Sequence, residues 1–162
     1  MSGSRGAAGW ARWMSLAARL VLAVVWIYAA STKLGRPLTS ARAVQAYELF
    51  PFDVAAAIGH ALPFVELVLG VLLLAGLFTR AMSVVSLALL VVFIAGIVSA
   101  WARGLQIDCG CFGGDGSLAF GQEPQYVQEI VRDLAYAACA AWLVWRPRSS
   151  FSVDGRLRAS AA

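Results

Sequence analysis

The sequence predicts an all-α integral membrane protein, a bundle of four helices. Of its 162 residues, 60% are hydrophobic and 14% are charged, whereas a soluble domain is about 45–50% apolar and about 25% charged. The apolar residues are gathered in long runs, and a helix needs about 20 of them to cross a bilayer. The expected helices cover about 14–34, 61–78, 81–101 and 126–145. They form one transmembrane domain over 14–145, with polar cytoplasmic tails at 1–13 and 146–162.

The first run can be read in two ways. Its length and its residues Trp26 and Tyr28 suit a spanning helix with interfacial anchors. A basic start, an apolar middle and the small residues Ala29 and Ala30 also occur in cleaved signal peptides. We expect a spanning helix and leave cleavage open.

Residues 35–59 are predicted to form a mixed loop that contains a short amphipathic helix on the membrane surface. The helical spacing covers 40–50, and Pro51 is expected to end it. Pro63 is expected in the first turn of the second spanning helix, where its missing N–H is harmless. The very short link at 79–80 makes the second and third runs an antiparallel hairpin.

The fourth run is less apolar than the others. Only 134–145 is wholly apolar, and twelve residues are too few to span. Adding 126–133 gives enough length but brings Glu129, Arg132 and Asp133 to the membrane edge.

The distribution of basic residues predicts the orientation, because cytoplasmic loops carry an excess of Lys and Arg. With both termini inside, seven basic residues lie on the inner side and four on the outer. The inner set is Arg5, Arg12, Arg80, Arg146, Arg148, Arg156 and Arg158, and the outer set is Lys33, Arg36, Arg42 and Arg103. The loop after the third run then faces outside, where disulfides persist. The basic residues form no single stripe, so nucleic acid is not an expected partner.

Cys109 and Cys111 are the strongest candidates for chemistry, since they lie one residue apart on that glycine-rich loop. A disulfide between them requires a bend at Gly110 and should be strained, and strained disulfides exchange readily. Asp108 disfavours a neighbouring thiolate, and Arg103 would oppose that effect. Redox exchange, a purely structural disulfide or free pair, and a metal site are the alternatives.

A metal site is the weakest of these. A closed site for a soft metal takes four ligands, and Cys139 lies about thirteen residues down the fourth helix, too deep to reach the pair. We expect Cys139 to pack as a small apolar residue. His60 lies on the outer side and is a candidate proton carrier for a thiol, or an ordinary surface histidine.

Charges inside the predicted membrane segments form a second candidate site. A charge there is costly, so each one should have a partner. We expect Glu66 to pair with Arg132, with Asp133 and Lys33 nearby. This cluster could relay protons, bind a polar headgroup, quinone or another small ligand, or simply lock two helices together.

Several stretches together resemble the methylamine-utilisation MauE family, within the wider DoxX-like group of four-helix membrane proteins. They are STKLGRP (31–37), AYELFP (46–51), LPFVELVLG (62–70), RGLQIDCGCFGG (103–114) and VRDL (131–134). The resemblance covers about 14–145, and DCGCFGG is its most specific element.

The resemblance implies four transmembrane helices and a role in maturing methylamine dehydrogenase, alongside a thioredoxin-like extracytoplasmic partner. Four-helix proteins that pass electrons from disulfides to quinone normally have two residues between their cysteines and a second pair. This chain has one intervening residue and one such pair, so quinone remains only a candidate cofactor. We predict a multi-pass cell-membrane protein, whether oxidoreductase or electron-transfer component, that exchanges disulfides with a thioredoxin-like protein or secreted client. The alternatives are a non-catalytic membrane subunit that anchors a redox complex, and a protein that binds quinone or another small ligand.

Overall fold

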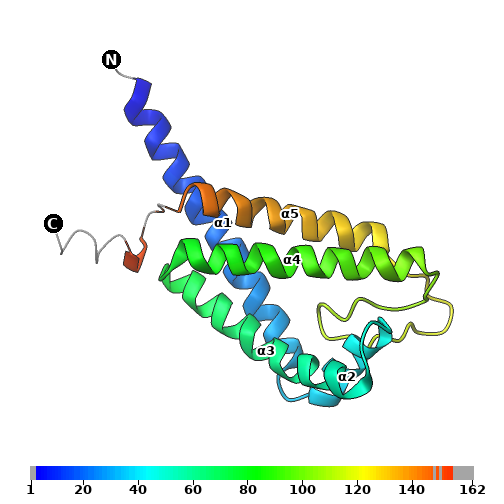
Figure 1. The fold of residues 1–162 in the computed structure, drawn as a ribbon. Helices are drawn as coiled ribbons and strands as arrows, with labels where there is room; N and C mark the ends of the chain where they lie inside the picture. The colour runs from blue at the N-terminus through cyan, green and yellow to red at the C-terminus, as the bar shows by residue number, and fades with distance from the viewer. Residues whose placement is uncertain (1–2, 148, 150, 155–162) are drawn as a thin grey trace.

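The computed structural model describes residues 3–147, 149 and 151–154 (Figure 1). These residues form helices and loops, with no strand among them. The five helices are α1 (Gly3–Lys33), α2 (Pro37–Ala46), α3 (Phe52–Ala75), α4 (Thr79–Ala102) and α5 (Tyr126–Trp145). The all-α class is confirmed, with four long helices and one short one. Residues 3–13, expected in a polar tail, belong to α1, while Arg148, Arg156 and Arg158 lie outside the described residues.

The start of α3 corrects the prediction for the second apolar run. The helix begins at Phe52 rather than near 61, so residues 52–59 are helical. Pro51 occupies the N-cap, where a backbone N–H is not required. Pro63 therefore lies inside the helix instead of in its first turn, and Glu66 lies beyond the midpoint of α3. The segment 52–59 contains no proline and one charged residue, Asp53, so nothing in it interrupts a helix.

The short helix α2 is also shifted from its predicted position. It starts at Pro37, an imino acid suited to the first helical turn, and ends at Ala46, before Glu48 takes a positive φ of 52°. Pro51 therefore does not terminate it. The helix packs on α3 at Gly59, where an added Cβ would lie 2.6 Å from the Cα of Ala41.

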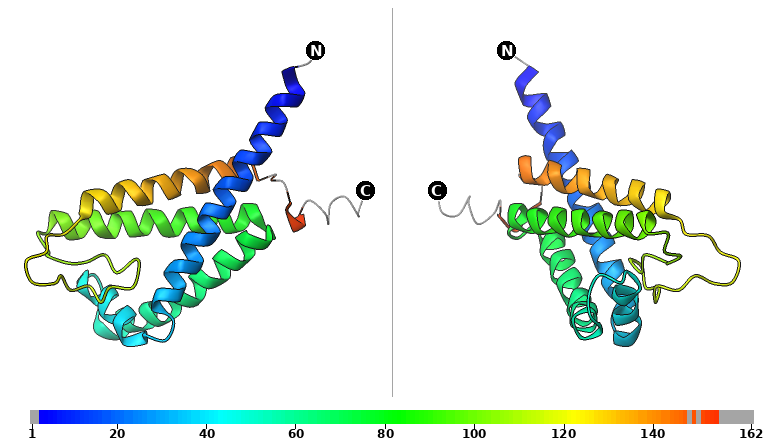
Figure 2. Two further views of the ribbon diagram at one scale, coloured as in Figure 1. Left: turned by 180° about the vertical axis from the view of Figure 1, so that it is seen from behind. Right: turned by 45° about the vertical axis from the view of Figure 1, so that its right-hand side comes forward.

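The long helices are arranged as an open V (Figures 1 and 2). One arm consists of α4 and α5, which pack side by side, and the other contains α3 packed against α1 and α2. The two arms meet where 76–78 connect α3 to α4, and α1 also crosses α5 near this closed end. The predicted hairpin is therefore a pair of helices that diverge from a short turn. The loop 103–125 and α2 occupy the open end.

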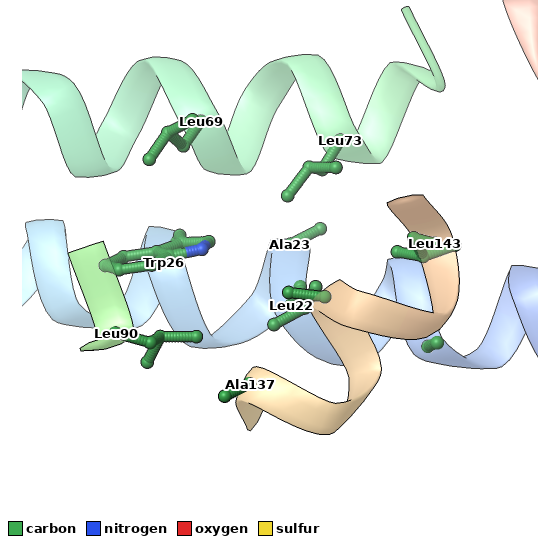
Figure 3. Close-up of a cluster of buried hydrophobic side chains, with 10 residues drawn as sticks. Leu22, Ala23, Trp26, Leu69, Leu73, Leu90, Ala137 and Leu143 are labelled. Atoms are coloured by element: carbon green, nitrogen blue, oxygen red, sulfur yellow. The ribbon is translucent and has the colours of Figure 1, made fainter. Parts of the chain in front are cut away.

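The closed half of the bundle has an apolar core (Figure 3). We call this cluster the apolar core: Ala18, Leu22, Ala23, Trp26, Leu69, Leu73, Leu90, Ala137, Ala140 and Leu143. Its one indole N–H, from Trp26, donates to the hydroxyl of Ser86 at 3.0 Å. Gly70 lets α3 approach α1, since a Cβ there would lie 2.6 Å from a side-chain carbon of Ile27.

Three helices in the described part of the chain are long and apolar enough to cross a membrane. They are Gly9–Lys33 within α1, Phe52–Ala75 and Thr79–Ala102. The fifth helix is not among them, which agrees with the lower apolar content expected of the fourth run.

Candidate functional site

The loop 103–125 is tied to the helices around it by two tyrosines. Tyr47, at the end of α2, donates its hydroxyl hydrogen to the carbonyl of Cys109 at 3.0 Å. Tyr126, at the start of α5, donates to the carbonyl of Leu105 and accepts from the N–H of Ile107 at 3.2 Å. Burial raises the pKa of Tyr47, so its phenol stays protonated as a donor. The cysteine segment is thereby fixed at the open end of the V.

A tight turn brings the two cysteines together. The Asp108 carboxylate accepts the N–H of Gly110 at 2.7 Å, and Gly110 has a φ of 65°, a conformation that glycine adopts without a Cβ penalty. The N–H of Cys111 then donates to the sulfur of Cys109 at 3.3 Å, while the Cys111 thiol faces the Cys109 carbonyl at 3.9 Å. The bend expected at Gly110 is present, and both cysteines are free thiols.

The two thiols have different surroundings. Cys109 is 9% exposed and Cys111 is more exposed. The Arg132 guanidinium lies 3.9 Å from the Cys109 sulfur and 4.6 Å from the centre of the Phe112 ring. Hydrogen bonding with Cys109, followed by burial, raises the pKa of the Cys111 thiol well above its ordinary value. The Cys109 sulfur therefore faces the Arg132 side chain and the N–H of Cys111. The Cys111 thiol, in contrast, stays protonated.

The charged side chains form two ion pairs that differ from the predicted one. Lys33 pairs with Glu66 at 2.5 Å, and both side chains are buried. Arg132 pairs with its neighbour Asp133 at 3.1 Å. The expected pair between Glu66 and Arg132 is therefore wrong. Because α3 packs along α1, the lysine at the end of α1 reaches Glu66 first, and Arg132 is held instead by Asp133, Phe112 and the Cys109 sulfur.

A small cavity lies between the thiol loop and these ion pairs. Its volume is about 20 Å³, and Cys111, Glu66 and Asp133 all line it. The remaining wall is largely apolar or aromatic: Val25, Trp26, Ala29, Leu90, Phe93, Phe112 and Tyr136. Pockets that bind drug-sized molecules measure about 300–1,000 Å³, so this cavity does not fit a quinone head group.

A wider hollow lies on the other side of Phe112. It measures about 320 Å³ and is lined by Ser31, Thr32, Leu34, Arg36, Phe112 and Gly113. Phe112 also contacts Tyr28 of α1, with ring centres 5.5 Å apart. The Phe112 ring lines both spaces, and it lies between this mostly polar hollow and the small cavity at Cys111.

Two other predicted residues stand apart from the thiols. His60 is exposed on α3, and no hydrogen bond or ion pair joins it to the loop within the described residues. Cys139 packs against the apolar core, as expected. No group of three or more His, Cys, Asp or Glu side chains in the described segments is placed to hold a metal ion.

Tyr47 and Glu129 were not predicted as site residues, although both adjoin Cys109. The Glu129 carboxyl lies against the Cys109 thiol, one helical turn before Arg132 and Asp133. Its spacing of three and four residues from that pair places all three on one side of α5, and this signal was present in the sequence. Tyr47 shares the apolar face of the 40–50 segment with Ala43, which marked it as a packing residue.

These features define a class: an all-α protein with membrane-spanning helices and a pair of free thiols on the loop between its last two helices. The chain belongs to the family described as methylamine utilisation protein MauE, which matches residues 11–146. Searches of curated proteins and of solved structures found no match. Family membership and the apolar helices make this a membrane protein of the methylamine-utilisation family.

Proposed function

We propose that the chain is a multi-pass protein of the cell membrane that exchanges disulfides with an extracytoplasmic client through Cys109 and Cys111. The observation that carries the proposal is the tight turn that joins the two free thiols, with the Cys111 N–H 3.3 Å from the Cys109 sulfur and Arg132 beside it. The family name supports methylamine utilisation as the setting. The client is then a thioredoxin-like protein or a disulfide-rich subunit that matures in that process.

The surface of α5 supports a fourth membrane-spanning helix. Val127, Val131 and Leu134 are more than half exposed, at 60%, 61% and 53%. Asp133 points inward and is 3% exposed. A helix with apolar residues outside and charges inside suits lipid contact better than water contact. Four spans place both ends of the chain on the same side of the membrane. The excess of basic residues on that side makes it the cytoplasm in this proposal, so the thiol loop lies outside.

The surroundings of the thiols assign their roles in the proposed exchange. A client disulfide meets Cys111, the more exposed sulfur. As Cys111 bonds to one client sulfur, the other leaves as a thiolate. Cys109, with the Cys111 N–H and Arg132 beside its sulfur, then gives its proton to the released client thiolate, attacks the Cys111 sulfur and releases the second client sulfur. Two electrons pass to the client and the pair becomes a disulfide. The reverse sequence oxidises a dithiol client.

Trapping tests these roles directly. In Cys109→Ser, Cys111 should retain the client as a mixed disulfide, detected by mass spectrometry after acid quenching of intact cells. Cys111→Ser should retain little, and Cys139→Ser is the matched control and should behave like the wild type. If the client has the same redox state in the double variant Cys109→Ser/Cys111→Ser as in the wild type, the proposal is contradicted.

A non-catalytic anchoring subunit is the second candidate, favoured by the 9% exposure of Cys109 and by its bond from Tyr47. In that role the cysteine segment only shapes the loop. The double serine variant would then co-purify with an intact, active partner, whereas the exchange proposal predicts an inactive or immature one.

A further inference from the structure

We propose that the cavity beneath Cys111 binds one water molecule between Glu66 and Asp133, and that this water-bridged carboxyl pair takes up the proton that Cys111 loses. The inference rests on the proposed exchange function and gives that site a proton acceptor. It assigns a chemical task to two carboxyl groups that are otherwise costly to bury.

The evidence begins with two oxygen atoms. Glu66 uses Oε1 for Lys33, and Asp133 uses Oδ1 for Arg132. Their second oxygens, Glu66 Oε2 and Asp133 Oδ2, are buried and have no hydrogen-bond partner among the described residues. The two side chains are 1% and 4% exposed. A buried polar atom without a partner is destabilising, more so when it is charged, so a hydrogen-bond donor at these oxygens is strongly favoured.

The cavity has the size of such a donor. Its volume of about 20 Å³ exceeds the roughly 10–15 Å³ that one water requires and leaves no room for a larger ligand. A water has two hydrogens to donate and can still accept from the Cys111 thiol, which lines the same cavity. Trp26, Leu90 and Phe93 form an apolar part of the wall.

The charges around the cavity balance before any proton moves. Lys33 from α1 offsets Glu66 from α3, and Arg132 offsets Asp133 on α5. The charged and titratable groups in or beside the cavity are Lys33, Glu66, Arg132, Asp133, Tyr136, Cys111 and, next to Cys111, Cys109. A proton released by Cys111 therefore finds two carboxylates within one water, where general-base assistance is typically worth about 10²- to 10⁴-fold in rate.

The step balances as follows. The Cys111 sulfur forms a bond to one sulfur of the client disulfide, and the client S–S bond breaks. The electron pair of that bond leaves with the second client sulfur. The thiol proton passes through the water to the carboxyl pair and later neutralises a released client thiolate. In the oxidising direction the carboxyl pair returns the proton to Cys111 as it leaves.

The test uses a chain in which Cys111 is the only thiol, Cys109→Ser/Cys139→Ser, purified in lipid nanodiscs. The probe is 2,2′-dithiodipyridine, a small neutral disulfide that releases coloured pyridine-2-thione when a thiol attacks it. In this parent we expect reaction at neutral pH. Adding Asp133→Asn should slow it at least tenfold, whereas Asp133→Glu should restore most of the rate and the exposed-loop control Glu123→Gln should leave it unchanged. Glu66→Gln should also slow it, but it leaves Lys33 buried without its partner, whereas the partner of Asp133, Arg132, is 27% exposed. Asp133→Asn, with its rescue by Asp133→Glu, is therefore the deciding variant.

A purely electrostatic role predicts the opposite sign, because removing a negative charge near Cys111 favours its thiolate. A rate in Asp133→Asn equal to or faster than the parent would therefore overturn the water-bridged acceptor and leave the exchange function standing. A Cys111 that does not react even in the parent would overturn both. A carboxyl C=O infrared band that appears on reaction and is lost in Asp133→Asn would support the acceptor independently of rate.

Discussion

The apolar core lies toward the closed end of the V, and a charged layer of Lys33, Glu66, Arg132 and Asp133 lies beneath the loop. Both use α1, α3 and α5, but burial has opposite energetic effects on their side chains. The apolar core joins α1, α3, α4 and α5 through residues such as Leu22, Leu73 and Leu143, each fully buried. Toward the open end of the V, three of these helices, α1, α3 and α5, present Lys33, Glu66 and Asp133, which are also buried. One region is stabilised by burial alone, and the other buries charges that water would otherwise solvate.

The difference separates what holds the fold from what serves the thiols. Replacing a buried ion pair with well-packed apolar residues is often neutral or stabilising, so we expect that the fold does not depend on the charged layer. Its position beside the thiols, and its two carboxyl oxygens without a partner among the described residues, support the proposed chemical role instead. The following substitutions test that separation, from the largest expected effect to the smallest.

Lys33→Ala should be the most damaging single change. It leaves the Glu66 carboxylate buried without its partner, and breaking a buried pair typically costs about 3–5 kcal/mol. Unfolding by denaturant in detergent micelles measures the loss, with Arg36→Ala, an exposed cation three residues further on, as control. Equal stability of the two variants would contradict a tight Lys33–Glu66 pair.

Leu73→Ala should destabilise the apolar core by about 2–5 kcal/mol, through lost burial and the cavity that remains. The same denaturant titration applies. The reaction rate of Cys111 in the folded protein should be unchanged, because Leu73 lines neither the small cavity at Cys111 nor the hollow beside Phe112. A changed rate would mean that the core and the thiol site are coupled.

Gly110→Ala should cost more than the roughly 1–2 kcal/mol of left-handed strain expected for a residue with a Cβ. Its Cβ would lie 2.6 Å from the Cβ of Ala43 on α2. Gly104→Ala is the matched control, since its φ of 68° is similar and no atom lies within 4 Å of an added Cβ. Protease resistance of the loop should fall in the first variant and much less in the second.

The reactivity of Cys111 should depend on pH in a predictable direction. Because the pKa of its thiol is raised, less thiolate is present at neutral pH, and alkylation should keep accelerating above the pH at which an ordinary cysteine levels off. The raised pKa also makes the stability of the fold depend on pH. The protonated Cys111 thiol stabilises the folded state below the ordinary pKa of a cysteine, and this stabilisation is lost as the pH rises through the pKa of Cys111 in the folded protein. Cys109→Ala removes the main cause and should speed Cys111 alkylation several-fold at neutral pH. A slower reaction would contradict the assigned hydrogen bond.

The sequence was sufficient to predict the four long helices, apart from where α1 and α3 begin, and the position of the thiol loop, because both depend on local pattern. Long apolar runs define α1, α3 and α4, and the spacing of Cys109 and Cys111 around Gly110 defines the turn. The partner of Glu66 could not be predicted, since it depends on which helices pack together. Once α3 lies along α1, Lys33 is closer than Arg132. The helical segment 52–59 was missed because it was read together with the more polar stretch 35–51 that precedes it.

The most direct test of the central claim is to replace the buried pair with apolar residues in the single-thiol chain, as Lys33→Met/Glu66→Leu. If the charged layer serves the thiols rather than the fold, this protein should be at least as resistant to denaturant as its parent. Its Cys111 should nevertheless react with 2,2′-dithiodipyridine at least tenfold more slowly at neutral pH. A stable double variant with an unchanged Cys111 rate would contradict the claim, as would one that loses several kcal/mol of stability and keeps its rate.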